Sequence, residues 1–177
     1  HRRQKNVGRN ALKFGNKIIN NLSLSTELNK VFDRQSLIHF CVDKNNSEID
    51  ITVAILAWGG MRFDHGRNLM RNWNHLEAII FDLRNKNIST RKDAFKEFQK
   101  IRAQGKLPGL GVGYFTKLIC FVNRDLNGYI LDQWTGKSIN FLWDDSLIKI
   151  SKSGWITDKN TPENYEKFCQ RIEQLSK

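Results

Sequence analysis

A single lysine in the middle of an apolar run is the first candidate for chemistry. Residues 112–122 are apolar except for Thr116 and Lys117. On a helix, side chains three and four positions apart share a face, and at these spacings Lys117 has the neighbours Gly113, Tyr114, Cys120 and Phe121. An ammonium group with no polar face to join either extends to water or is kept for chemistry. Desolvation lowers the pKa of a lysine, so the amine could be a neutral nucleophile near pH 7.

A glycine-rich turn, residues 107–111 (Leu-Pro-Gly-Leu-Gly), precedes the lysine. Glycine lets the backbone turn tightly and approach a partner without a Cβ in the way. Between two helices this segment predicts a hairpin, and the free N–H groups at the start of the second helix suit a phosphate. Gly109 and Gly111, with Gly113 just beyond them, are therefore candidates for binding a phosphate backbone.

Asp132 follows Lys117 by fifteen residues and stands at the predicted start of another helix. The commoner role of aspartate at such a position is to cap the helix N-terminus. The alternative role is to stabilise a positive charge or to accept a proton from the lysine. Burial and a nearby carboxylate change a lysine pKa in opposite directions, so the sequence leaves the net direction open.

The elements that must position these residues are mainly helices. The run 51–58, although rich in β-branched residues, is interpreted as a buried helix that ends at Gly59-Gly60. Residues 33–43 are ambiguous between helix and strand, and residues 151–158 are predicted to be irregular. The other expected helices cover residues 7–22, 24–32, 65–73, 74–83, 91–104 (capped by Thr90), 112–122, 133–143 and 163–175 (after Thr161-Pro162).

Charge indicates the kind of partner. The 177 residues include 29 Lys and Arg against 18 Asp and Glu, which gives a net charge of +11. This excess favours a polyanion, and nucleic acid first, because no stretch is long and apolar enough for a membrane span. Residues 1–20 hold six basic and no acidic residues. That composition is typical either of a phosphate-contacting arm or of a solvated terminus.

Cysteine and histidine usage argues against a metal cofactor. The three cysteines, Cys41, Cys120 and Cys169, stand singly and fit buried thiols in a reducing compartment better than disulfides. They lack the clustering of a zinc or iron–sulfur site. The four histidines show no ligand spacing either. We therefore expect no metal ligands among these residues.

Helix, hairpin, helix and a following aspartate make up a pattern that resembles the helix-hairpin-helix DNA glycosylases. The separation of Gly111 from Asp132 is similar to that of the 8-oxoguanine DNA glycosylase branch. Residues 130–134 (Ile-Leu-Asp-Gln-Trp) resemble that family's approach to the helix after the hairpin. Residues 54–61 resemble the helix end that leads to its DNA-invading loop. The resemblance covers residues 51–143 and is closest to the compact prokaryotic members.

The position of the lysine departs from the family pattern. Members with lyase activity place a lysine two residues after the second hairpin glycine, where this chain has Gly113. Because residues i and i+4 share a helix face, Lys117 could reach the same pocket from one turn below. We expect Gly113 to clear the path for this long side chain.

The resemblance implies a mainly α fold with two helical subdomains and a cleft between them. Residues 51–143 would form the helix-hairpin-helix catalytic region. Residues 1–50 would be a helical segment that packs with the C-terminal part, and residues 144–177 would be a C-terminal helical segment. The last helix is interpreted as packing, although related folds use it to close the base pocket.

The resemblance also implies a mechanism. Lys117 would attack C1′, release the base and leave a Schiff base from which β-elimination nicks the strand, while Asp132 would stabilise the cationic sugar. Extruding a base costs roughly a few kcal/mol, so an aromatic pocket and a wedge are expected. The candidates for these roles are Trp58, Met61, Phe63, Trp134 and Phe168. Each tryptophan taken alone is more often a core residue.

Three arginines are candidates for binding phosphates. Arg62, Arg67 and Arg71 follow the Gly59-Gly60 turn. They form either a phosphate-contacting row or only a solvated helix face, and the basic charge of the chain favours DNA. The resemblance further implies a monovalent cation held by hairpin carbonyls, and no other cofactor.

Three functions therefore compete. The first is a DNA glycosylase and AP lyase that removes 8-oxoguanine or another modified purine from double-stranded DNA, and the Lys117–Asp132 pair favours it. The second is a monofunctional glycosylase in which Asp132 activates water. The third is a non-catalytic helix-hairpin-helix module that binds DNA in a repair or phage-defence system. We expect a monomer in the cytoplasm, associated with the nucleoid and not with a membrane.

Overall fold

The computed structural model describes residues 8–20 and 23–175. The regular secondary structure of these residues is helical. Their one β feature is an isolated antiparallel bridge between Ile150 and Ile156. The predicted mainly α fold is thus confirmed. Half of the six basic residues of the N-terminal arm fall in residues 1–7, outside the described residues. The helices are α1 (Ala11–Ile18), η1 (Thr26–Leu28), α2 (Arg34–Val42), α3 (Glu48–Trp58), α4 (Phe63–Met70), α5 (Trp73–Arg84), α6 (Arg91–Ala103), α7 (Val112–Val122), η2 (Arg124–Leu126), α8 (Gln133–Leu142) and α9 (Pro162–Leu175).

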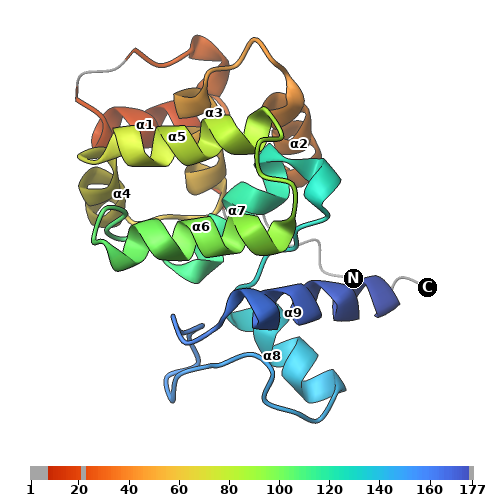
Figure 1. The fold of residues 1–177 in the computed structure, drawn as a ribbon. Helices are drawn as coiled ribbons and strands as arrows, with labels where there is room; N and C mark the ends of the chain where they lie inside the picture. The colour runs from red at the N-terminus through yellow and green to blue at the C-terminus, as the bar shows by residue number, and fades with distance from the viewer. Residues whose placement is uncertain (1–7, 21–22, 176–177) are drawn as a thin grey trace.

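Helix α7 lies at the centre of the fold. It packs against α2, α3, α5 and α6, and Figure 1 shows these helices gathered around it. A helix that is apolar all round is stable only when neighbours cover every face. The surroundings of α7 meet that condition, and residues 115–122 are all buried. The apolar sequence of α7 therefore carries Lys117 into the interior of the protein.

Helix α3 confirms the interpretation of the β-branched run as a buried helix. Residues 50–57 are all buried, so tertiary packing decides against strand propensity. Gly59 is the C-cap, and Gly60 follows with φ of +70°. Glycine adopts that left-handed conformation without the strain of a Cβ. The predicted helix end at this pair is therefore confirmed.

The other boundaries show where local sequence signals suffice. Thr90 caps α6, and Pro162 is the first residue of α9, as predicted. The ambiguous segment 33–43 is a helix, because Asp33 and Ser36 form a capping box. The helix predicted over 24–32 is wrong, since only a single 3-10 turn forms there, capped by Ser25.

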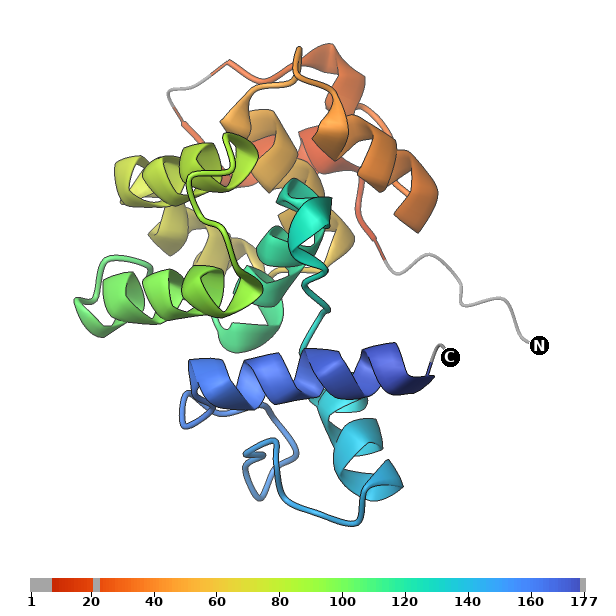
Figure 2. The same ribbon diagram turned by 45° about the vertical axis from the view of Figure 1, so that its right-hand side comes forward.

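Helices α8 and α9 form a second layer, which lies below the rest in Figures 1 and 2. Helix α9 packs on α6 and α8. The buried guanidinium of Arg91 on α6 ties these layers together by donating to Glu166 and Glu173 of α9 and to the Asn127 carbonyl. Helices α1 and α2 pack chiefly on α3, α4 and α7. These are not the C-terminal partners that we expected for residues 1–50.

Candidate functional site

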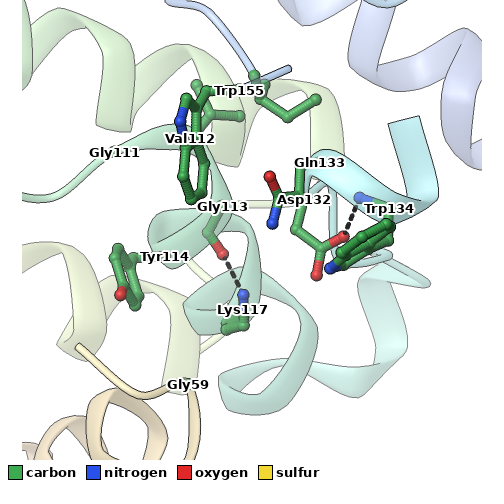
Figure 3. Close-up of a pocket in the computed structure, with 11 residues that line it drawn as sticks. Gly59, Gly111, Val112, Gly113, Tyr114, Lys117, Asp132, Gln133, Trp134 and Trp155 are labelled. Atoms are coloured by element: carbon green, nitrogen blue, oxygen red, sulfur yellow. Dashed lines mark hydrogen bonds between the residues drawn. The ribbon is translucent and has the colours of Figure 1, made fainter. Parts of the chain in front are cut away.

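A pocket of about 310 Å³ opens beside the N-terminal turn of α7. Four separate segments supply its walls: the end of α3, the hairpin with the first turns of α7, the start of α8, and a turn near residue 155. It brings together the predicted residues Gly111, Gly113, Lys117, Asp132 and Trp134 (Figure 3). The remaining lining residues are Gly59, Val112, Tyr114, Gln133, Trp155 and Ile156.

Lys117 reaches this pocket from one turn below the usual position of the family's lysine. Its residue is only 9% exposed, and Nζ donates to the Gly113 carbonyl at 2.9 Å (Figure 3). Burial lowers the pKa of Lys117 below the 10.5 of an ordinary lysine, while the charge of Asp132 opposes that change. Desolvation is the larger of the two effects, which decides the direction that the sequence left open.

Gly59, at the end of α3, makes room for the lysine side chain. A Cβ at this position would lie 3.1 Å from Lys117 Cδ and 3.4 Å from its Cε. Our expectation that Gly113 clears the path is wrong, because a Cβ there would meet Asp132 and the Leu131 carbonyl instead. These contacts, at 3.7 Å from Asp132 Cβ and the Leu131 carbonyl oxygen, are ordinary van der Waals distances, so a Cβ at Gly113 would be accommodated.

Asp132 caps α8 and lines the pocket at the same time. Its Oδ1 accepts from the backbone N–H groups of Trp134 at 2.9 Å and Thr135 at 3.1 Å. The Thr135 hydroxyl in turn accepts from the Asp132 N–H, which completes a capping box. The predicted capping role is confirmed. The cap also fixes the carboxylate on the wall that it shares with Lys117 (Figure 3).

The Thr116 side chain links the helix that carries Lys117 to the backbone next to Asp132. Its buried hydroxyl donates to the Val112 carbonyl at 2.8 Å and accepts from the Leu131 N–H at 3.0 Å. One side chain thus connects the helix that carries Lys117 with the residue before Asp132. Our sequence reasoning did not give Thr116 a role, although it is the other polar residue of the apolar run.

The two hairpin glycines occupy different surroundings. Gly109 has φ of +79°, and a Cβ there would lie 3.0 Å from backbone atoms of His65 in α4. Gly111 has an ordinary φ of −73° and open space where a Cβ would stand. Gly109 therefore holds the hairpin against α4, whereas Gly111, the N-cap of α7, has room beside it for a Cβ or a ligand atom.

The predicted arginines lie outside the pocket, on or next to α4. Arg62, Arg67 and Arg71 are all exposed. Arg62 forms an ion pair with Asp64 at 2.8 Å. Because the hairpin packs on α4 through Gly109 and His65, these side chains belong to the helix that borders the hairpin.

Of the five residues predicted for the base pocket or wedge, only Trp134 lines the pocket. The structure places the other four in packing positions. Met61 and Phe168 are fully buried. Phe63 stacks on Phe14, and Trp58 makes an edge-on contact with Phe121. Met61 and Phe168 thus belong to the core, whereas Trp58 and Phe63 pack against it, remain partly exposed and lie outside the pocket lining.

Within residues 8–20 and 23–175, no group of three or more His, Cys, Asp or Glu side chains is arranged to hold a metal ion. All three cysteines are buried and free. In the same part of the chain, no helix combines the length and the apolar character that crossing a bilayer requires.

Comparison with known protein families decides what kind of protein contains this site. A family model named OGG, described as "Putative 8-oxoguanine DNA glycosylase OGG-like protein", matches residues 10–177. The chain belongs to the OGG family. The match runs from α1 to α9 and so includes segments on both sides of residues 51–143. Neither the curated proteins nor the solved structures gave a match to the chain.

Membership of the OGG family gives the site a chemical context. The family is one of DNA glycosylase-like proteins, so DNA is the partner of this protein, in agreement with its net charge of +11. The pocket at the hairpin brings together the buried amine of Lys117 on α7 and the carboxylate of Asp132, the N-cap of α8. Tyr114, Gln133 and Trp155 also line it, although sequence reasoning gave none of them a role in the site.

Proposed function

We propose that this OGG-family protein is a DNA glycosylase and AP lyase that removes 8-oxoguanine or a related modified purine, with Lys117 as the nucleophile. One observation carries the proposal. Lys117 is a buried amine with a lowered pKa, and it lines the same pocket as Asp132 at the helix-hairpin-helix. A structural lysine would gain nothing from such a position, because burying an ammonium group is costly.

The proposed steps follow from the contacts of the two groups. The neutral amine of Lys117 forms a bond to C1′ while the bond from C1′ to the base breaks, and the departing base takes up the proton that the attacking amine gives up. The Gly113 carbonyl accepts a hydrogen bond from one N–H of the amine, so the lone pair on the nitrogen remains available to attack C1′. The sugar ring then opens as O4′ takes a proton from water, which leaves a protonated Schiff base at C1′. Loss of a proton from C2′ to water then breaks the bond from C3′ to the 3′ phosphate oxygen, and the phosphate departs. Asp132 stabilises the positive charge that develops on the sugar.

Borohydride trapping on a duplex that contains 8-oxoguanine tests this proposal. Borohydride reduces the Schiff base, so the lyase is expected to give a covalent protein–DNA complex together with base release. Base release without trapping would favour the monofunctional alternative, in which Asp132 activates water. DNA binding with neither product would overturn the proposed activity and favour the non-catalytic module.

The pH dependence of the reaction reports on the Lys117 amine. Only the neutral amine attacks, so kcat/KM for adduct formation should rise with pH through the pKa of Lys117 and then level off. Because burial lowers that pKa, the midpoint is expected below the 10.5 of an ordinary lysine. Rapid-quench measurements from about pH 6 to pH 11 would check this. A midpoint at or above 10.5 would contradict the proposed nucleophile.

We propose that DNA phosphates approach the hairpin at Gly111, where a Cβ would meet nothing within 4 Å and the backbone N–H groups of the first turn of α7 suit an anion. The exposed Arg62, Arg67 and Arg71 would contact phosphates nearby. The Leu107 carbonyl accepts a backbone hydrogen bond from the Leu110 N–H and keeps a second lone pair, so it is the hairpin carbonyl that fits the implied monovalent cation. The Gly111 carbonyl already accepts from the N–H groups of both Tyr114 and Phe115.

Two alanine variants separate the roles of the hairpin glycines. Gly109→Ala is expected to lower the free energy of unfolding by about 2 kcal/mol, because its left-handed backbone is strained once a Cβ is present and that Cβ would press on His65. Gly111→Ala should leave stability within roughly 0.5 kcal/mol but weaken DNA binding by about tenfold, the value of one hydrogen bond to phosphate. Thermal unfolding and a DNA titration measure both effects. Unchanged DNA affinity in Gly111→Ala would place the phosphate elsewhere.

A further inference from the structure

The pocket has a wall that neither the hairpin nor the Lys117–Asp132 pair accounts for. Trp155 and Ile156 line it, and they come from residues 144–161, which connect α8 to α9. Trp155 is 62% exposed. An indole left in water forgoes the large gain that aromatic side chains obtain from burial, so folding by itself does not explain its position.

The turn that carries Trp155 is held in place by hydrogen bonds. The Ser151 N–H donates to the Trp155 carbonyl at 2.8 Å, and the Trp155 N–H donates to the Ser151 hydroxyl at 3.0 Å. The fully buried Asn160 accepts from the Lys149 N–H and donates to the carbonyls of Lys149 and Thr157. A fully buried amide with three such bonds fixes the backbone of the turn.

The turn is also docked on α8, directly after Asp132. A Cβ at Gly136 would lie 2.7 Å from Ile156 Cδ1, so glycine at this position lets the turn press against the helix. The base of the turn is therefore anchored next to the capping carboxylate. The indole of Trp155 lies at the pocket beside Gly111 and Val112 of the hairpin side (Figure 3).

A second exposed tryptophan and an amide complete this part of the pocket. Trp134, at the start of α8, is 69% exposed. Figure 3 shows the side chain of Gln133 between the rings of Trp155 and Trp134. Flat aromatic faces bind nucleobases by stacking, and an amide carries both donors and an acceptor for a base edge.

We propose that Trp155 is the stacking surface for the extruded base and that Gln133 contacts the edge of that base. This inference rests on the proposed function, because a glycosylase must take its target base out of the duplex. It assigns to the segment between α8 and α9 the recognition of the base. It also leaves catalysis to Lys117 and Asp132.

Two duplexes separate contact with the base from contact with the backbone. Both have the same sequence; one contains 8-oxoguanine, and the other contains a tetrahydrofuran abasic site at that position. Binding is measured in the Lys117→Gln background so that the base is not released. Trp155→Ala is expected to weaken binding of the 8-oxoguanine duplex by about 5- to 100-fold, with the tetrahydrofuran duplex unchanged. Trp155→Phe, which keeps a flat ring, should restore most of the loss.

Phe141→Ala is the matched control, because Phe141 is 85% exposed on α8 and does not line the pocket. It should bind both duplexes like the parent, and thermal unfolding should show that each variant is folded. An equal loss on both duplexes, or no loss for Trp155→Ala, would overturn the stacking role. If the wild type excises the base and Trp155→Ala excises it equally well, only this inference is overturned. A wild type that releases no base overturns the proposed function as well.

Discussion

Replacing Lys117 with glutamine is expected to abolish the borohydride-trapped complex and strand nicking at 8-oxoguanine. Glutamine has no amine to form a Schiff base, so the loss should be complete and not partial. Its neutral amide also avoids the cost of burying a charge at this position, which is only 9% exposed. The variant should therefore be at least as stable as wild type in thermal unfolding and should still bind DNA.

Lys137 provides the matched control for this experiment. It is an exposed lysine of α8, with Nζ 5.5 Å from the ring of Trp134 at the pocket. An adventitious adduct could form on such a lysine, because its amine is accessible near the site. Lys137→Gln is expected to keep the trapped complex. Trapping that survives in Lys117→Gln and disappears in Lys137→Gln would contradict the proposed nucleophile.

Replacing Asp132 with asparagine is expected to slow base release by about 100- to 1000-fold, the usual effect of removing one electrostatic group from an active site. The fold should be unaffected, because asparagine caps helices as well as aspartate does and its carbonyl oxygen can accept from Trp134 and Thr135 N–H. Single-turnover excision and thermal unfolding measure the two effects. The substitution thus removes the charge and keeps the cap.

Asp132→Ala separates these contributions further. It removes the carboxylate and the cap together, so a loss of about 1 kcal/mol in unfolding free energy should accompany the loss of activity. If Asp132→Asn excised the base at the wild-type rate, Asp132 would be an N-cap only. The pH midpoint should also move, because the charge of Asp132 raises the pKa of Lys117. Residual trapping in Asp132→Asn should therefore show a lower midpoint.

Short-range signals determined much of this protein from the sequence. Thr90, Asp132 and the Thr161-Pro162 pair mark helix starts, and Gly59-Gly60 marks a helix end, as the structure confirms. Such signals are readable because each cap depends on hydrogen bonds within about four residues. The failed helix over residues 24–32 has a similar origin. Ser25 caps a turn and Leu24, Leu28, Val31 and Phe32 have helical spacing, but a short helix is costly to nucleate and only one 3-10 turn forms.

Tertiary structure decided which residues meet in the pocket. Met61 and Phe168 are apolar or aromatic candidates by type, yet core neighbours cover them. Two contacts of the pocket depend on residues far apart in the sequence. Gly59 lies against Lys117, and Trp155 lines the same pocket as residues 111–117. Periodicity shows that a face is apolar but not which segment will cover it. The sequence by itself thus determined the helix-hairpin-helix and its lysine and aspartate, because these depend on local backbone geometry. The base-facing wall depends on long-range packing, which only the folded chain defines.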